Sequence, residues 1–237
     1  MIAPASTIAT QALPVTPAFR YERKFLPDRL SPSAAEASLK LHPALFARAF
    51  PERTVNNIYL DSPDLRHYLN HLNGAAERLK VRIRWYGTPL GGIPRPVLEL
   101  KHKRGDVGHK QSYPLPPLSF QNGFCPDAVR AILRDADLPD LARSQVLCLE
   151  PLLFNSYQRR YFCSADGRYR VTLDFNLKFA RPRRGLRLPP EAFHPFTGLI
   201  LELKYAPEDA PGVESITNRF PFRLTRFSKY VAGIDAS

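Results

Sequence analysis

The amino-acid sequence predicts an α+β protein: one antiparallel β-barrel of about eight strands with helices packed on its outside. The first observation is that short segments of alternating apolar and polar residues recur from residue 21 to residue 205. The second is that no internal repeat and no linker divides these segments. Strands spread along the chain favour a single β-rich domain. Closing the sheet into a barrel removes edges that would otherwise be exposed.

The expected strands have the alternation and the β-branched and aromatic residues typical of a sheet. In chain order they are YERKF (21–25), TVNNIYLD (54–61), ERLKVRIRWYG (77–87), PVLELKHK (96–103), HKQSYPL (109–115), NSYQRRYFC (155–163), RYRVTLDFNL (168–177) and LILELKY (199–205). The chain has 24 prolines but only 12 glycines. This composition predicts rigid loops between short strands.

Three segments between the strands are expected to be helical. Residues 31–50 begin with Ser-Pro, and residues 63–72 and 126–136 begin with Pro-Asp, both favourable first turns. In the first segment an apolar stripe is formed by Leu39, Leu45, Phe46 and Phe50. The Pro- and Arg-rich residues 180–196 are expected to form a loop.

Charge and composition narrow the class of protein. The 34 Lys and Arg residues outnumber the 22 Asp and Glu residues, so the net charge of +12 predicts an anionic partner. The apolar fraction of 44% excludes wholesale disorder, and no apolar run is long enough to span a membrane. Three cysteines without metal-ligand spacing fit a reducing compartment. We therefore expect a cytoplasmic protein, with residues 1–18 as a disordered lead-in and residues 19–237 as one domain.

Alternation along the strands gathers the charged residues on one face of the sheet. Residues two apart in a strand share a face, so Lys80, Arg82 and Arg84 lie opposite Val81 and Ile83. Four further strands repeat this pattern, with charged faces that carry Glu22 and Lys24; Glu99, Lys101 and Lys103; Arg170 and Asp174; and Glu202 and Lys204.

Two interpretations explain this charged face. A sheet with one solvated face is the simpler one, but it predicts Ser, Thr, Asn and Gln where charges recur on strand after strand. A barrel whose lumen holds an anion explains the charges better. Such a lumen needs a ligand and interleaved carboxylates, because like charges repel strongly in a low dielectric. Arg and Lys suit phosphate oxygens, and carboxylates suit Mg²⁺ or Mn²⁺. Glu202, with Glu99 and Glu22 behind it, is the expected ligand set; simple pairing with Lys and Arg is the alternative.

Several short motifs, in matching order, resemble the VTC (vacuolar transporter chaperone) domain of polyphosphate polymerases, a branch of the triphosphate tunnel metalloenzymes. They are RYERKF, LKVRIRWYG, LELKHK, YQRRYF, RVTLDFNL, LELKY and SKY, which run from about residue 19 to residue 234. The resemblance implies an eight-stranded antiparallel tunnel that transfers the γ-phosphoryl of ATP onto a growing polyphosphate chain, with Mn²⁺ or Mg²⁺.

The resemblance also implies roles for residues. The basic residues that match the phosphate-binding positions are Lys24, Arg82, Arg84, Lys101, Lys110, Arg159, Arg170 and Lys229, with Ser228 beside the last. Of these, Arg82, Arg84, Lys101, Arg159 and Arg170 are assigned to catalysis. Glu202 matches the metal ligand of the family. The strand pattern adds further candidates on the charged face: Lys80, Lys103 and Lys204 for binding the substrate, and Glu99 and Glu22 for binding the metal. Arg20 replaces the first Glu of the superfamily's Glu-x-Glu-x-Lys motif, which argues against a two-glutamate site on this strand.

Four functions stay open at this stage. A polymerase needs no general base, because the end of a polyphosphate chain is already anionic. A tri- or polyphosphate phosphohydrolase needs a carboxylate to orient water, for which Glu99 or Asp174 qualifies. The other two are a non-catalytic polyphosphate or nucleotide sensor and an RNA-binding barrel. No specific nucleic acid is expected, because in most strands the aromatic side chains lie opposite the Arg face. The membrane-spanning parts that accompany the eukaryotic polymerase domain are missing from this sequence. Export of polyphosphate is therefore expected to require a membrane-protein partner, which would hold the domain at the inner face of a membrane.

Overall fold

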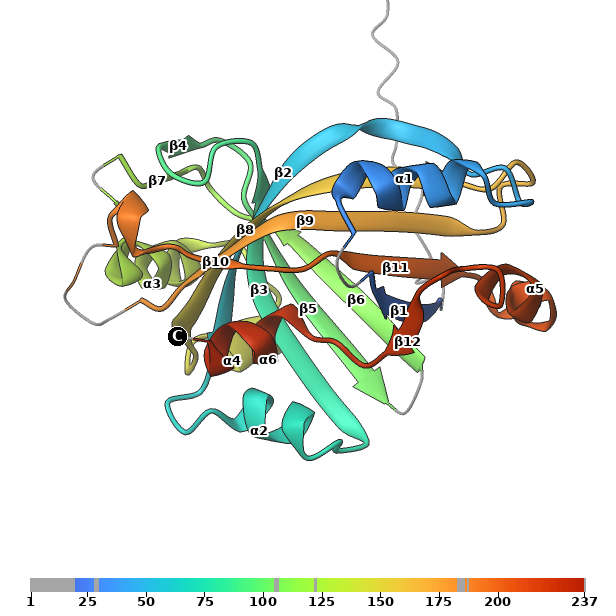
Figure 1. Ribbon diagram of the computed structural model, residues 1–237. Helices are drawn as coiled ribbons and strands as arrows, with labels where there is room; N and C mark the ends of the chain where they lie inside the picture. Colours follow the sequence, from blue (N-terminus) through green and yellow to red (C-terminus); the bar gives the residue numbers. More distant parts are fainter. Residues whose placement is uncertain are drawn as a thin grey trace, which may run out of the picture.

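The computed structural model describes residues 20–27, 30–104, 107–121, 123–182, 186 and 188–236. Its main sheet is antiparallel, and hydrogen-bonded neighbours follow the order β12-β1-β11-β9-β8-β2-β3-β5-β6, with β10 added to β9 (Figure 1). A second, two-stranded sheet pairs β4 with β7. The α+β class with an antiparallel sheet is thus confirmed, whereas the expected lead-in over residues 1–18 lies outside the described residues.

All the predicted strands are present, and short strands are added to them. The bounds are β1 Tyr21–Leu26, β2 Ala47–Asp61, β3 Glu77–Tyr86, β4 Gly92–Ile93, β5 Val97–Arg104, β6 Val107–Pro114, β7 Leu118–Ser119, β8 Glu150–Cys163, β9 Arg170–Ala180, β10 His194–Phe196, β11 Ile200–Tyr205 and β12 Arg223–Thr225. The hydrogen-bonded path ends at β12 and β6. Across this gap, Lys101 Nζ of β5 lies 3.3 Å from Glu22 Oε2 of β1. Side chains of the two ends therefore meet around a lumen.

The helices are shorter than the sequence predicts. Their bounds are α1 Pro32–Lys40, α2 Arg66–Leu72, α3 Pro126–Asp135, α4 Asp140–Val146, α5 Val213–Thr217 and α6 Lys229–Asp235, with 3₁₀ turns at Pro190–Ala192 and Pro207–Gly212. The helix expected over residues 31–50 was wrong beyond Lys40. The helix ends at Lys40 with Leu41 as its C-cap, Leu45 takes a left-handed backbone (φ 52°) that a continued helix could not contain, and from Ala47 onward the chain pairs with β8. None of the helices in the described ranges is long and apolar enough to cross a bilayer.

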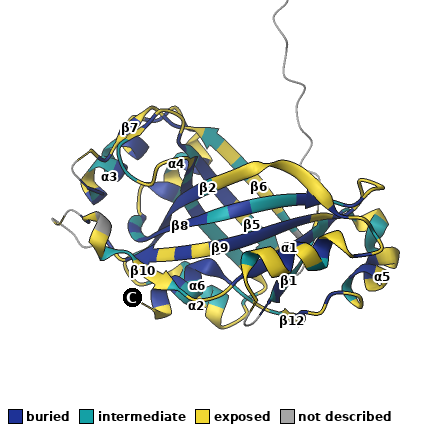
Figure 2. Ribbon diagram, turned by 45° about the horizontal axis from the view of Figure 1, so that its top comes forward, coloured by how far each residue is buried: buried dark blue, intermediate teal, exposed yellow. Residues whose placement is uncertain are grey.

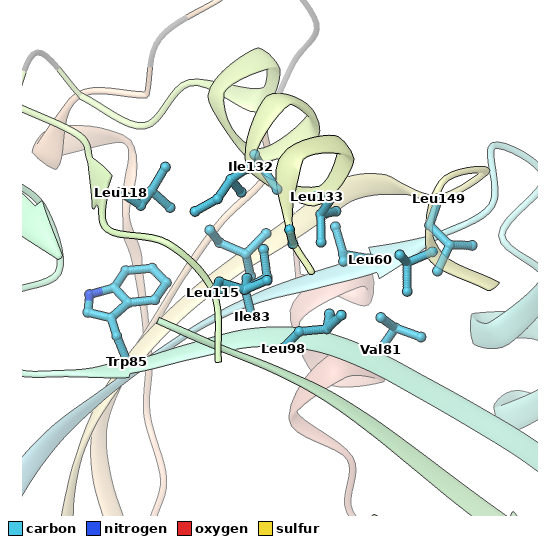
Figure 3. Close-up of a cluster of buried hydrophobic side chains, with 14 of the residues drawn as sticks. Leu60, Val81, Ile83, Trp85, Leu98, Leu115, Leu118, Ile132, Leu133 and Leu149 are labelled. Atoms are coloured by element: carbon cyan, nitrogen blue, oxygen red, sulfur yellow. The ribbon is translucent and has the colours of Figure 1, made fainter. Parts of the chain in front are cut away.

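The apolar faces of the strands point outward and are covered by helices. One cluster joins the outer face of β3 and β5 to α3 and α4; Figure 3 shows Trp85, Ile83 and Leu98 beneath the helix that carries Ile132 and Leu133. A second cluster joins β1, β9 and β11 to α1 and α5. Burial of these faces drives the fold, and it leaves the charged faces turned inward.

Helix α6 packs against lumen-facing residues. Its Tyr230 and Ile234 belong to a third apolar cluster with Tyr59, Leu153 and Tyr157, and the rings of Tyr59 and Tyr230 stack at 5.1 Å. The approach is close, because a Cβ on Gly233 would lie 2.5 Å from Leu153 Cδ2 and 2.6 Å from Phe179 Cδ1. This packing carries the start of α6, Ser228 and Lys229, into the charged part of the lumen.

Candidate anion-binding lumen

Basic side chains from separate elements converge inside the sheet. They are Lys24 of β1, Lys80, Arg82 and Arg84 of β3, Lys101 of β5, Lys110 of β6, Arg159 of β8, Lys204 of β11 and Lys229 of α6. For Lys24, Lys80, Arg82, Arg84, Lys101 and Lys204, alternation along the strand explains the position, since at least one sequence neighbour of each is in an outer apolar cluster. Carboxylates divide these cations into groups.

Glu99 of β5 organises the first group. Arg82 donates to Glu99 Oε2 from Nε at 2.8 Å and from Nη2 at 2.6 Å, and Lys110 Nζ donates to Oε1 at 2.7 Å. Arg84 Nη1 lies 3.5 Å away and also donates from Nε to Asn57 Oδ1 at 2.8 Å. Burial would raise the pKa of Glu99, but the charges of Arg82 and Arg84 outweigh it and hold the pKa well below its usual range. Glu99 is therefore a carboxylate saturated by cations.

Asp174 of β9 organises the second group and is fully buried. Arg159 donates to its two oxygens from Nε at 2.6 Å and from Nη2 at 2.7 Å, a bidentate pair. Lys229 Nζ makes an ion pair with Asp174 Oδ2 and lies 4.9 Å from the ring centre of Tyr157. Burial would raise the pKa of Asp174, but Arg159 and Lys229 outweigh it and lower the pKa.

Glu202 of β11 is ringed by cations from four elements. The distances to its carboxylate oxygens are 3.1 Å for Lys204, 3.4 Å for Lys229, 3.5 Å for Lys24 and 3.8 Å for Arg159. These charges hold the pKa of Glu202 well below its usual range against the opposing effect of burial. Glu202, the predicted metal ligand, thus lies among the predicted phosphate-binding residues.

The remaining predicted residues lie toward the ends of the strands. Glu22 lies 3.1 Å from Lys24 and 3.3 Å from Lys101. Burial and Glu202 would raise the pKa of Glu22, but Lys24, Lys101 and Lys204 hold it at about 2. Lys103 is half-buried farther along β5. Arg170 is exposed at the first residue of β9, where it pairs with Lys204 in register.

Lys80 is placed beside uncharged partners. Its Nζ donates to Ser228 Oγ at 2.9 Å and lies 3.4 Å from His71 Nε2. Burial and the nearby charges of Lys24 and Lys101 lower the pKa of Lys80 well below its usual value. Burial and Lys80 together lower the pKa of His71 to about 3, so this imidazole is neutral at physiological pH. The lumen therefore holds an excess of positive charge, which lowers the pKa of Lys80 and of His71.

Comparison with known proteins identifies this architecture. The family model of the VTC domain matches residues 19–237. This chain belongs to the VTC domain family. A search of curated protein sequences found no match for it.

Solved structures resemble this VTC domain in fold. A proposed adenylate cyclase from Vibrio parahaemolyticus is 12% identical, with a TM-score of 0.52, over 91% of this chain and 97% of that one. HpAC1 from Hippeastrum, a proposed adenylyl cyclase with a dominant triphosphatase activity, is 14% identical, with a TM-score of 0.51, over 92% of this chain and 96% of that one. At these identities the likeness shows the triphosphate tunnel fold alone.

The superfamily implies a divalent metal ion, and the carboxylates of the VTC domain fit one in a limited way. Glu22 pairs with Lys204 and Glu202 pairs with Lys24, so the two glutamates are diagonal neighbours on β1 and β11. In the part of the chain that the structure describes, no group of three or more His, Cys, Asp or Glu could hold an ion. Glu202 and Glu22 therefore fit Mg²⁺ or Mn²⁺ only as an ion that takes its other ligands from phosphate oxygens and water.

Sequence reasoning considered Asp174 only as a base for water in a phosphohydrolase, and it did not assign Tyr157 or His71 to the lumen of the VTC domain. Alternation along β9 put Asp174 on the charged face, but only its burial and its contacts with Arg159 and Lys229 reveal its role. Tyr157 lies on the lumen face two residues before Arg159, and its hydroxyl is 3.4 Å from Arg84 Nη2. Such tyrosines carry no charge, so the charge pattern did not mark them.

We expect the VTC domain to take up protons when it binds tripolyphosphate at about pH 8. The pKa of Lys80 is lowered in the free lumen, and we expect a bound anion to raise it, so that the number of protons bound increases when the complex forms. Calorimetric titration in two buffers of different ionisation enthalpy measures this uptake. Lys80→Arg, which is charged in both states, should lose it, whereas Lys40→Arg on the exposed end of α1 should keep it. Equal uptake by wild type and Lys80→Arg would contradict the assignment to Lys80.

Proposed function

We propose that this VTC domain is a divalent-metal-dependent polyphosphate polymerase that transfers the γ-phosphoryl of ATP to a polyphosphate chain inside the lumen. The observation that carries the proposal is the state of the lumen carboxylates. Glu99, Asp174 and Glu202 are each contacted by at least two cations, and the pKa of each is lowered. A carboxylate with a strongly lowered pKa is a poor general base for water. The lowered pKa values therefore argue against hydrolysis, which needs a base to activate water. They do not affect attack by the end of a polyphosphate chain, which is already anionic.

The transfer needs positioning and charge neutralisation. A terminal oxygen of the polyphosphate chain attacks the γ-phosphorus, the new P–O bond forms, and the bond from that phosphorus to the β–γ bridging oxygen breaks. ADP leaves with the electron pair, so no proton has to be abstracted. Arg82, Arg84 and Arg159 supply guanidinium charge beside the phosphoryl oxygens, and Lys229 adds a point charge at the start of α6. Glu202 and Glu22 would hold the divalent metal ion, which would neutralise further phosphate charge.

The substrates of this proposal are ATP and polyphosphate, with Mn²⁺ or Mg²⁺ as the metal. The proposal places the reaction in the cytoplasm, as the sequence predicts. It includes no membrane partner, because no surface feature of the described residues supports one.

Incubating the pure protein with ATP and MnCl₂ or MgCl₂ tests the proposal. We expect ADP to form together with polyphosphate chains that lengthen with time on a gel, and Arg82→Ala to form neither. Inorganic phosphate without chain growth would instead identify a phosphohydrolase, the activity of HpAC1. Tight binding of ATP and polyphosphate without turnover would identify a sensor.

A further inference from the structure

Four side chains form an aromatic and cationic surface at one end of the lumen, here called the rim platform: Phe50, Arg53, Tyr86 and Tyr161. The guanidinium carbon of Arg53 lies 5.6 Å from the ring centre of Tyr86 and 5.9 Å from those of Phe50 and Tyr161. The rings of Phe50 and Tyr161 meet edge to face at 5.8 Å. Phe50 is 56% exposed and Tyr86 is 53% exposed, so ring surface is open to solvent.

A β-bulge brings these residues to one face. In a regular strand Phe50 and Arg53 would point to opposite sides, because they are three residues apart. The pairing of β2 with β8 shifts register between them, so that Phe50 pairs with Tyr161 and Arg53 pairs with Arg159. Bulges commonly re-aim side chains next to functional sites. Figure 2 shows the half of β2 that carries them as an exposed ribbon above the buried residues of β8 and β9.

The rim platform continues the row of phosphate-binding candidates. Tyr86 follows Arg84 by two residues on β3, and Tyr161 follows Arg159 by two residues on β8, so each shares the face of its cation. Two residues of strand span about 6.5–7 Å. Along β2 and β8 the platform lies beyond Val55 and Tyr157, whereas α6 covers Tyr59 and Leu153 on the other side.

The chemistry of the platform suits a flat, uncharged group attached to a phosphate chain. Aromatic rings and arginine planes stack on nucleobases at about 1–3 kcal/mol per base. Phosphate oxygens gain nothing from open ring faces, so bare polyphosphate does not explain exposed rings beside a basic lumen. We propose that the rim platform is a subsite for the nucleobase of the nucleoside triphosphate whose phosphates occupy the lumen. This inference rests on the proposed function and adds the nucleotide's orientation: base at the rim, terminal phosphate toward Arg159, Lys229 and α6.

Binding measurements with two ligands test the subsite. The probes are a non-hydrolysable ATP analogue and inorganic tripolyphosphate, titrated calorimetrically into wild type, Phe50→Ala and Tyr86→Ala. We expect each alanine variant to bind the ATP analogue about 5- to 50-fold more weakly and to bind tripolyphosphate as the wild type does. Tyr86→Trp should retain the affinity for the ATP analogue, and Leu141→Ala, on the exposed face of α4, should change neither ligand.

The outcomes separate the subsite from the proposed function. Unchanged affinity for the ATP analogue in both alanine variants, or equal loss for both ligands, would overturn the subsite while tripolyphosphate binding by the wild type still supports the phosphate lumen. If the wild type binds neither ligand, the proposed function fails and the subsite fails with it.

Discussion

Asp174→Asn is expected to lower the free energy of unfolding by about 3 kcal/mol, because the change removes the nearest anion of two buried cations and leaves them only the more distant Glu202. Asp174 is fully buried between Arg159, which binds it through both oxygens, and Lys229. Its pKa is lowered in the folded protein, so the contribution of the carboxylate is fully present above its ordinary pKa of 3.8 and is lost as the pH falls toward the lowered value. Tripolyphosphate should restore much of the stability of the variant, since it supplies the missing negative charge.

Urea unfolding at neutral pH, with and without tripolyphosphate, measures this effect. The matched control is Asp127→Asn on α3, where an exposed carboxylate lies 2.7 Å from Arg130 Nη1. A surface pair of this kind is worth about 0–1 kcal/mol. Equal loss of stability in the two variants would refute the role of Asp174 as the neutralising anion of the lumen.

Arg82→Ala and Arg84→Ala are each expected to weaken tripolyphosphate binding by about 10- to 100-fold, the equivalent of a charge-assisted hydrogen bond of about 1.5–3 kcal/mol. Both guanidinium groups face the lumen from β3 and contact Glu99. Glu99 keeps Lys110 and the other arginine as partners in either variant, so the fold is expected to survive. Calorimetry at two salt concentrations gives the affinity and its electrostatic part.

Arg134→Ala is the control for the loss of one positive charge. Arg134 is exposed on α3, which packs on the outer face of the sheet. If all three variants bound tripolyphosphate equally well, general basicity would explain anion binding and the lumen would have no specific part in it.

Alternation was sufficient to predict most of the sheet and its charged face. Val81 and Ile83 are buried outside, while Lys80, Arg82 and Arg84 point inward, as residues two apart in a strand must. The prediction failed where backbone geometry overrides composition. Phe46 and Phe50 have helical spacing, but the left-handed backbone at Leu45 and pairing with β8 make residues 47–50 part of β2.

The bulge in β2 had a second consequence that no periodicity reveals. It brings Phe50 and Arg53 to one face beside Tyr161, although they are three residues apart. This is an exception to the expectation that aromatic side chains oppose the arginine face. A register shift depends on the partner strand, which lies about 100 residues away along the chain.

Outside the bulge in β2, the sequence alone determined which residues face inward, because alternation is a local property of each strand, and its motifs determined the family. It did not determine which cations each carboxylate holds. Glu202 contacts cations from β1, β8, β11 and α6. Asp174 of β9 makes ion pairs with Arg159 of β8 and Lys229 of α6. These groups are distant in sequence and meet only when the sheet curves and α6 packs against its lumen face. Coulombic attraction acts over a few ångströms of space, so the tertiary structure decided the electrostatics of the lumen.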